Sequence, residues 1–133
     1  MAKETKEARK KTSMGMDENL EALLAYLFSI IGGLIFFLGE KNSKFVRFHA
    51  LQSILLGVVL IAVIIILSII FGIVGLVLSP SAWLAISFII GLINLVVYLG
   101  FIVLTIICMI KAYQMEGFKI PVIGEIAEKQ VSK

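Results

Sequence analysis

One apolar stretch, Ile54–Ile110, constrains this chain more than any other feature. It contains no Asp, Glu, Lys, Arg or His, and the Ser79–Ser81 turn is its main break. As helices, Ile54–Leu78 and Ala82–Ile110 would be roughly 37 Å and 43 Å long, whereas a bilayer's hydrocarbon core is about 30 Å thick. A chain of this length has too little other protein to cover two such helices in water. The sequence therefore predicts an integral membrane protein.

Composition agrees with this interpretation. Of the 133 residues, 60% are hydrophobic, which is outside the usual range of soluble domains. The net charge of +3 comes from residues outside the apolar stretch. We therefore expect anionic lipid headgroups as partners rather than nucleic acid. Cys108 is the only cysteine, so no internal disulfide is possible. No signal peptide is expected, because no small-residue cleavage pattern follows the first apolar run.

We predict an all-α integral membrane fold with three transmembrane helices, at residues 20–38, 50–78 and 82–110. These form one membrane domain over residues 17–113. Residues 1–16 alternate in charge and are predicted to be a disordered polar arm, with a basic arm for lipid or a partner as the alternative. Residues 114–133 are predicted to be an interfacial C-terminal strap with a loose end, because Gly117, Pro121 and Gly124 argue against one continuous helix.

The first predicted span presents small residues on one helical face. Ala25, Ser29 and Gly33 recur at intervals of four, a spacing that lets another helix approach closely in lipid. The alternative is that small residues are simply common in membrane spans. The adjacent Gly32 and Gly33 also leave open a re-entrant hairpin, although residues 20–38 suffice to cross.

The connection at residues 40–50 alternates aromatic and basic side chains, a pattern typical of the membrane interface. Ser43 is its predicted helix N-cap. The candidate headgroup-binding residues are Lys44, Arg47, His49, Gln52, Lys111 and Lys119. His49 is not expected to bind a metal, because no second ligand accompanies it. A structural hydrogen bond and a headgroup contact both remain open for this side chain.

Two further stripes are candidates for helix packing. Ser53 and Gly57 follow His49 at intervals of four. The third predicted span carries a polar stripe with the period of a helix face, which begins with Ser87, Gly91, Asn94 and Tyr98 and continues to Thr105, Cys108 and Ala112. An unpaired amide in hydrocarbon costs several kcal/mol. We therefore expect Asn94 to face protein, either as a contact between helices or as the lining of a conduit.

Three spans would place the 40–50 loop and the C-terminal strap on one membrane face, with the N-terminus and the 79–81 turn on the other. The basic residues nearest the membrane belong to the loop and the strap: Lys41, Lys44, Arg47, Lys111 and Lys119. Basic residues near the membrane favour the cytoplasmic side. We therefore predict that the loop and the C-terminus are cytoplasmic and that the N-terminus is outside.

Two segments carry a family resemblance: FVRFHALQS at Phe45–Ser53 and IKAYQMEGFKIPVIG at Ile110–Gly124. They resemble a prokaryotic family of small three-span membrane proteins of unknown function, which is described as similar to the Tic import subunit of the plastid inner envelope. The family is also similar to the magnetosome membrane proteins MamF and MmsF. The resemblance implies a fold and a prokaryotic membrane location. It marks as signature positions Arg47, His49, Gln52, Lys111 and Pro121.

Three classes of function can be compared. An enzyme is disfavoured, because one His, one Cys within a span and no intramembrane carboxylate suggest no catalytic site, metal site or cofactor. A channel or translocation pore would need several copies, since three spans enclose little and carry no ionisable group at mid-membrane. We therefore expect a small non-enzymatic structural or interaction subunit, which is a homo-oligomer or part of a larger membrane complex. A subunit of an oligomeric channel or protein-translocation pore is the alternative.

Overall fold

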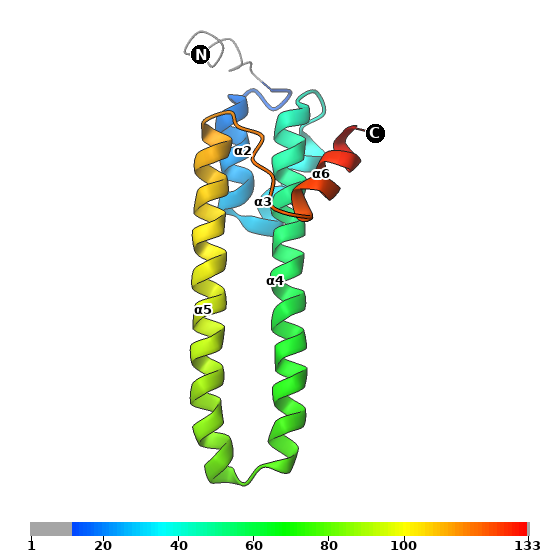
Figure 1. The fold of residues 1–133 in the computed structure, drawn as a ribbon. Coiled ribbons are helices and arrows are strands. Elements are labelled where there is room, and N and C mark those ends of the chain that lie inside the picture. Colours follow the sequence, from blue (N-terminus) through cyan, green and yellow to red (C-terminus); the bar gives the residue numbers. More distant parts are fainter. Residues whose placement is uncertain (1–11, 133) are drawn as a thin grey trace. The chain divides into compact units, whose positions relative to one another are not determined.

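The computed structural model describes residues 12–132, which fold into helices joined by short connections (Figure 1). In chain order these helices are α2 (Glu18–Leu27), α3 (Ser29–Gly39), α4 (Lys44–Val77), α5 (Pro80–Tyr113) and α6 (Ile123–Ser132). The predicted all-α class is confirmed. Most of the predicted arm, residues 1–11, lies outside the described residues. The remainder begins with a turn in which the Thr12 N–H donates to the Met16 carbonyl at 2.9 Å.

Two described helices, α4 and α5, are long and apolar enough to cross a membrane. Each has 34 residues, or about 51 Å of helix. α4 begins as predicted, because the Ser43 hydroxyl accepts a hydrogen bond from the Val46 N–H at 3.2 Å. α5 begins with Pro80, whose ring suits the first helical position. The Trp83 N–H then donates to the Ser79 carbonyl at 2.8 Å.

The first of the three predicted spans, residues 20–38, is not confirmed as a transmembrane helix. The chain forms two short helices there, with 10 residues in α2 and 11 in α3, and Phe28 separates them. Ser29 has a φ of 53°, the left-handed region in which a helix cannot continue. The Ser53 hydroxyl lies 2.8 Å from the Ala25 carbonyl and 3.0 Å from the Ser29 carbonyl. Its single proton can thus be shared between these two carbonyls, and the Ala25 carbonyl lies in the last turn of α2, where the interruption removes helical partners.

The two ends of the α2–α3 segment lie close together. The Ser13 N–H donates to Oε2 of Glu40 at 2.9 Å, and the Lys41 N–H donates to the Ser13 hydroxyl at 3.2 Å. α2 and α3 also pack against each other (Figure 1). The chain therefore enters and leaves this segment at the same side, as in a re-entrant hairpin. The break lies at Phe28–Ser29 rather than at the glycine pair that suggested this alternative.

The described chain divides into two compact units. Unit 1 consists of residues 12–58 and 105–132, and unit 2 consists of residues 59–104. The core of unit 1 is formed by Ala25, Phe36, Val46 and Ala50. All the buried residues of α4 and α5 belong to unit 1. Within the described chain, the side chains of unit 2 are therefore exposed or half-buried, and none is fully buried.

The C-terminal strap is more ordered than predicted. Residues 114–122 form a non-helical segment, and α6 then takes up positions that were expected to be a loose end. Met115 has a φ of 62°. The Met115 and Glu116 N–H groups donate to the carbonyls of Ala112 and Lys111, at 3.1 and 2.9 Å. These paired hydrogen bonds form a Schellman motif that ends α5.

Candidate functional site

His49 occupies the centre of a buried polar cluster in unit 1. Its Nε2 lies 3.0 Å from the carbonyl oxygen of Glu116, and its Nδ1 lies 2.8 Å from the Tyr26 hydroxyl. A carbonyl can only accept, so Nε2 carries the proton and Nδ1 accepts from the Tyr26 hydroxyl. Both ring nitrogens of this neutral tautomer are therefore satisfied.

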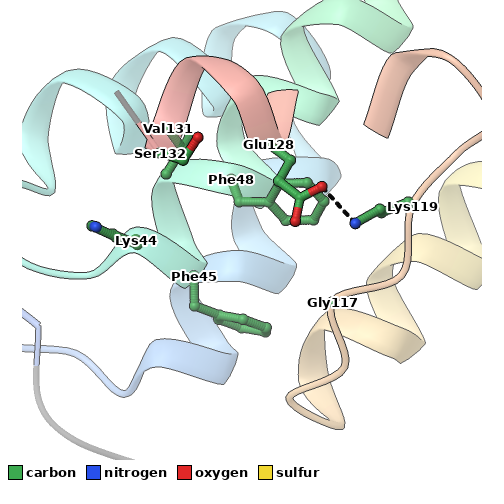
Figure 2. Close-up of a pocket in the computed structure, with 8 residues that line it drawn as sticks. All are labelled: Lys44, Phe45, Phe48, Gly117, Lys119, Glu128, Val131 and Ser132. Atoms are coloured by element: carbon green, nitrogen blue, oxygen red, sulfur yellow. Dashed lines mark ion pairs between the residues drawn. The ribbon is translucent and has the colours of Figure 1, made fainter. Parts of the chain in front are cut away.

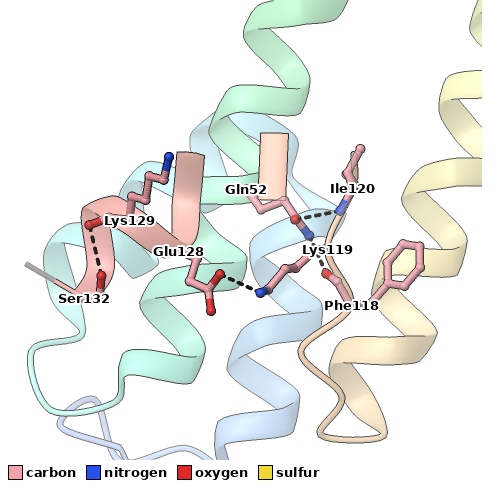
Figure 3. Close-up of polar contacts among 7 residues, drawn as sticks. All are labelled: Gln52, Phe118, Lys119, Ile120, Glu128, Lys129 and Ser132. Carbon is pink, nitrogen blue, oxygen red and sulfur yellow. Dashed lines mark hydrogen bonds and ion pairs between the residues drawn. The ribbon is translucent and has the colours of Figure 1, made fainter. Parts of the chain in front are cut away.

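Gln52 extends the cluster to the non-helical segment at residues 114–122. Its Nε2 donates to the Tyr26 hydroxyl at 2.6 Å and to the Phe118 carbonyl at 3.0 Å. Its Oε1 accepts from the Ile120 N–H at 3.1 Å, and Figure 3 shows the two contacts to the segment. A single amide thus binds this segment at two backbone positions.

Aromatic rings enclose the imidazole. The ring centroids of Phe45, Phe48 and Tyr26 lie 4.6, 5.0 and 5.5 Å from that of His49, all in edge-to-face orientation. His49 and Gln52 are both 0% exposed. Neither can therefore contact a headgroup in this fold. For His49, the geometry matches the structural hydrogen bond that the sequence left open.

The basic candidates lie in separate environments. Lys111 pairs with Glu116 at 2.9 Å, and Lys119 pairs with Glu128 at 2.5 Å. The Arg47 guanidinium lies 4.8 Å from the centre of the Phe37 ring, within range of a cation–π contact. Lys44 is exposed. The structure therefore does not bring the predicted headgroup residues together as one set.

Lys44 and Lys119 do line one common groove, which we call the α4–α6 groove. It has a volume of about 330 Å³. Its lining comes from the start of α4, the 114–122 segment and α6 (Figure 2), and consists of Lys44, Phe45, Phe48, Gly117, Lys119, Glu128, Val131 and Ser132. The groove combines two phenyl rings with charged side chains.

The first two small-residue stripes pack against each other within unit 1. A Cβ added at Gly33 would lie 2.7 Å from the Ala50 carbonyl oxygen. One added at Gly57 would overlap Ile30 and lie 3.1 Å from the Ser29 hydroxyl. Only glycine permits so close an approach at these two positions. Ala25, Ser29, Gly33, Ser53 and Gly57 therefore form contacts within one chain.

The stripe on α5 divides between the two units. Its last members, Cys108 and Ala112, are buried in unit 1. In unit 2, Asn94 is half-buried, and its side chain forms no hydrogen bond with any residue that the structure describes. A Cβ added at Gly91 would meet no atom within 4 Å. At the centre of the unit 2 part of the stripe, which also includes Ser87 and Tyr98, Asn94 therefore has no hydrogen-bond partner and Gly91 no close neighbour among the described residues.

Sequence reasoning did not identify a cluster of carboxylates beside Ser43. Glu40 is fully buried and accepts from the Asn42 and Ser43 N–H groups at 2.7 and 2.9 Å. Burial alone would raise the pKa of Glu40, but these hydrogen bonds and those from Ser13 outweigh burial and lower the pKa. The Ser43 hydroxyl also donates to Glu18 at 2.6 Å. A serine N-cap close to acidic residues was the available sequence signal.

Glu21 lies in the first turn of α2, outside the two candidate spans. It is fully buried, and neither of its carboxylate oxygens has a hydrogen-bond partner among the described residues. Burial, which outweighs the lowering effect of the Thr12 side chain and is reinforced by the nearby Glu40 and Glu18, raises the pKa of Glu21 to about 7. Within residues 12–132, no group of three or more His, Cys, Asp or Glu side chains could hold a metal ion.

Comparison with known proteins gives a consistent picture. A family model described as the magnetosome magnetite crystal formation protein family matches residues 10–127. A UPF0132 membrane protein of Methanocaldococcus jannaschii is 47% identical over 119 residues, covering 90% of this chain and 93% of that protein. A UPF0132 membrane protein of Archaeoglobus fulgidus is 39% identical over 116 residues, covering 87% and 97%. No solved structure matches. The predicted magnetosome resemblance is confirmed, whereas a likeness to the plastid Tic subunit is not shown.

Proposed function

The chain belongs to the magnetosome magnetite crystal formation protein family, and we propose that it acts as a non-enzymatic structural subunit of a prokaryotic membrane assembly. The observation that carries the proposal is Asn94, a half-buried amide of unit 2 whose side chain has no hydrogen-bond partner among the described residues and whose surroundings are mainly apolar. Apolar side chains can face lipid, but an amide gains by pairing with another polar group. A second copy supplies such a group.

The buried polar cluster supports a non-enzymatic role. The chain's one histidine has both ring nitrogens engaged, so it has no free site with which to act as a base. The one cysteine is buried. These groups stabilise a fold rather than face a substrate.

The α2–α3 arrangement supports a revised orientation in the membrane. If this segment is re-entrant, the N-terminal arm, the 40–43 connection and the C-terminal strap all lie on one membrane face. The turn at residues 78–79 alone reaches the other face. All Lys and Arg residues lie outside Ile54–Ile110, so every basic residue would be on the first face. The positive-inside rule then assigns both termini to the cytoplasm, whereas three spans predicted an external N-terminus.

Single cysteines test this orientation. We expect Ser13→Cys and Ser132→Cys to react with a membrane-impermeant thiol reagent only after the cells are opened. Ser79→Cys should react in intact cells. A Cys108→Ala background removes the native thiol. Labelling of Ser13→Cys in intact cells would restore the three-span arrangement.

Crosslinking in native membranes tests self-association. We expect the wild-type chain to yield dimers or higher oligomers, and Asn94→Leu to reduce them strongly, because the pairing amide is lost. Ser68→Leu is the matched control in unit 2, since its hydroxyl already donates to the Ile64 carbonyl of the same helix at 2.7 Å. A wild-type chain that remains monomeric and crosslinks to no other protein would exclude the structural role.

The second candidate function is a subunit of an oligomeric channel or translocation pore. The same stripe on α5 favours it, because Asn94 and Tyr98 would line a conduit formed by several copies. Reconstitution in liposomes separates the two functions. Solute flux or conductance that disappears in Asn94→Leu supports the pore, whereas crosslinked oligomers without flux support the structural role.

A further inference from the structure

The α4–α6 groove has the chemistry of a lipid site. We propose that it binds one anionic phospholipid, with the phosphate diester beside Lys44 and the first part of an acyl chain against Phe45 and Phe48. This inference rests on the proposed membrane function and deepens it by naming a ligand class and its site. It concerns only residues of unit 1.

The apolar wall of the groove suits a hydrocarbon chain. Phe48 is 8% exposed and Phe45 is half-buried, and both rings are held edge-on to His49. Val131 of α6 adds an aliphatic side chain. Rings that are already packed lose little conformational freedom when a ligand binds. The wall is therefore preformed for an apolar group.

The charges of the groove favour an anion. Glu128 is paired with Lys119 at 2.5 Å (Figure 3), so these two charges offset each other. Lys44 is exposed and forms an ion pair with no carboxylate that the structure describes. The lining thus has one uncompensated positive charge, which matches the single negative charge of a phosphate diester. Figure 2 shows Lys44 on the α4 side of the groove, across from Lys119 and Glu128.

Close packing keeps the opposite wall in place. Gln52 binds the backbone on both sides of Lys119, at Phe118 and Ile120. A Cβ added at Gly124 would lie 2.6 Å from the Lys119 Cβ and 2.7 Å from the Gln52 Oε1, so the start of α6 lies directly on this segment. The buried polar cluster therefore positions the wall of the groove.

The volume of the groove limits what can occupy it. About 330 Å³ is near the lower end for ligand pockets. It accommodates a phosphate headgroup and the first methylenes of one chain, with the rest of the chain outside. A free phosphate would use the charge of Lys44 but would leave both phenyl rings without a ligand. The combined lining therefore favours an amphiphile.

Native mass spectrometry of the full chain in mild detergent, with added phosphatidylglycerol, tests the proposal. We expect Lys44→Ser to weaken retention of one lipid about tenfold, the effect of losing a charge-assisted contact. The matched control is Lys41→Ser, which removes the same charge from an exposed residue three positions before Lys44 that does not line the groove. It should leave retention unchanged. Equal losses in both variants would indicate general surface attraction, and retention by Lys44→Ser would exclude the site; either result overturns the proposal.

A phosphatidylglycerol analogue with a photoreactive group near the start of one acyl chain tests the apolar wall without a mutation. We expect its adducts at residues 44–48 and 128–132, and we expect glycerol phosphate in excess not to displace it. Adducts elsewhere, or displacement by glycerol phosphate, would overturn the lipid assignment. Crosslinking of the same samples reports self-association separately. Loss of lipid retention with oligomers intact would refute the groove and leave the proposed function standing.

Discussion

The two units of this chain satisfy their polar groups in opposite ways. In unit 1, His49 and Gln52 are fully buried, and their side chains are hydrogen-bonded to Tyr26 and to backbone groups of residues 116–120. In unit 2, Asn94 has no side-chain hydrogen bond with any described residue. The polar side chains of unit 1 therefore find their hydrogen-bond partners within the same chain. In unit 2, a partner for the Asn94 amide has to come from lipid, water or another protein.

The two units also differ in backbone conformation, because strained residues occur in unit 1. Among residues 12–132, the non-glycine residues with positive φ are Ser29, Met115 and Val122. All three belong to unit 1, and none belongs to unit 2. Strained backbone persists where surrounding contacts determine it. A folded unit with dense contacts can maintain such residues, and a pair of regular helices in lipid has no need of them.

Each unit contains a natural reporter. Cys108 is fully buried in unit 1, so the rate at which a thiol reagent labels it measures how often unit 1 opens. Trp83 lies in unit 2, where its ring packs against Gly75. Its fluorescence therefore reports on unit 2. Mutations can be assigned to one unit by following both signals in the same sample.

The largest effect is expected from Gln52→Leu. The substitution leaves the Phe118 carbonyl and the Ile120 N–H without their partner, and it removes a donor to the Tyr26 hydroxyl. Buried groups left unpaired cost about 1–3 kcal/mol each, so we expect unit 1 to lose about 4 kcal/mol. Labelling of Cys108 should accelerate greatly while Trp83 fluorescence is retained. Ser68→Ala, a loss of one hydroxyl in unit 2, should leave Cys108 protected; equal labelling in the two variants would remove the distinction between the units.

The second prediction uses glycines of opposite surroundings. Gly33→Ala should destabilise unit 1 by about 2 kcal/mol, the cost of overpacking, because the new methyl group meets the Ala50 carbonyl oxygen and Ile54. Gly100→Ala in unit 2 meets no atom within 4 Å. It should stabilise its helix by about 0.5–1 kcal/mol. Thermal unfolding in detergent, followed by both reporters, measures the two signs; a stabilising Gly33→Ala would contradict the close packing of α3 on α4.

The difference between the units also explains what the sequence could predict. The absence of charge over Ile54–Ile110 is a local property, so it predicted both long helices, and Ser43 was recognised as an N-cap from its own position. The break at Phe28–Ser29 has no glycine or proline. It depends on the Ser53 hydroxyl, which lies on another helix. Such tertiary contacts override local propensity.

The candidate site could likewise be predicted only in part. His49 and Gln52 were identified from the sequence, but apart from the Tyr26 hydroxyl their hydrogen-bond partners are backbone groups more than 60 residues away along the chain, and backbone groups have no sequence signature. Gly124 was interpreted as a helix breaker. In the structure Gly124 lies inside α6. Glycine is required there because a larger side chain would collide with Lys119 and Gln52. Close approach, rather than a turn, accounts for this residue.

The third prediction concerns the pH dependence of unit 1. The pKa of Glu21 is raised to about 7 from 4.5 by burial, so folding favours the protonated carboxyl. Stability should therefore be greatest below about pH 4.5 for this group and should decrease as the pH rises through 7. Allowing for screening by water, the decrease should be on the order of 1–2 kcal/mol. Because the thiolate is the reactive form, the labelling rate rises with pH in every variant, so the ratio of Cys108 labelling between the wild type and Glu21→Gln at pH 5 and at pH 8 measures it. Glu21→Gln should lose this dependence; an unchanged slope would assign the effect to another group.

The smallest effect is expected at Met115, where the backbone rather than a side chain is tested. Its φ of 62° lies in the left-handed region, which costs a residue with a Cβ roughly 1–2 kcal/mol and costs glycine little. Met115→Gly should therefore stabilise unit 1 by about 0.5–1 kcal/mol after the greater flexibility of glycine in the unfolded chain is counted. Cys108 labelling should slow accordingly, and Trp83 fluorescence should not change. If Met115→Gly instead accelerates labelling, the methionine side chain stabilises unit 1 by more than its backbone strain costs. The contrast between unit 1 and the regular helices of unit 2 would then rest on side-chain contacts alone.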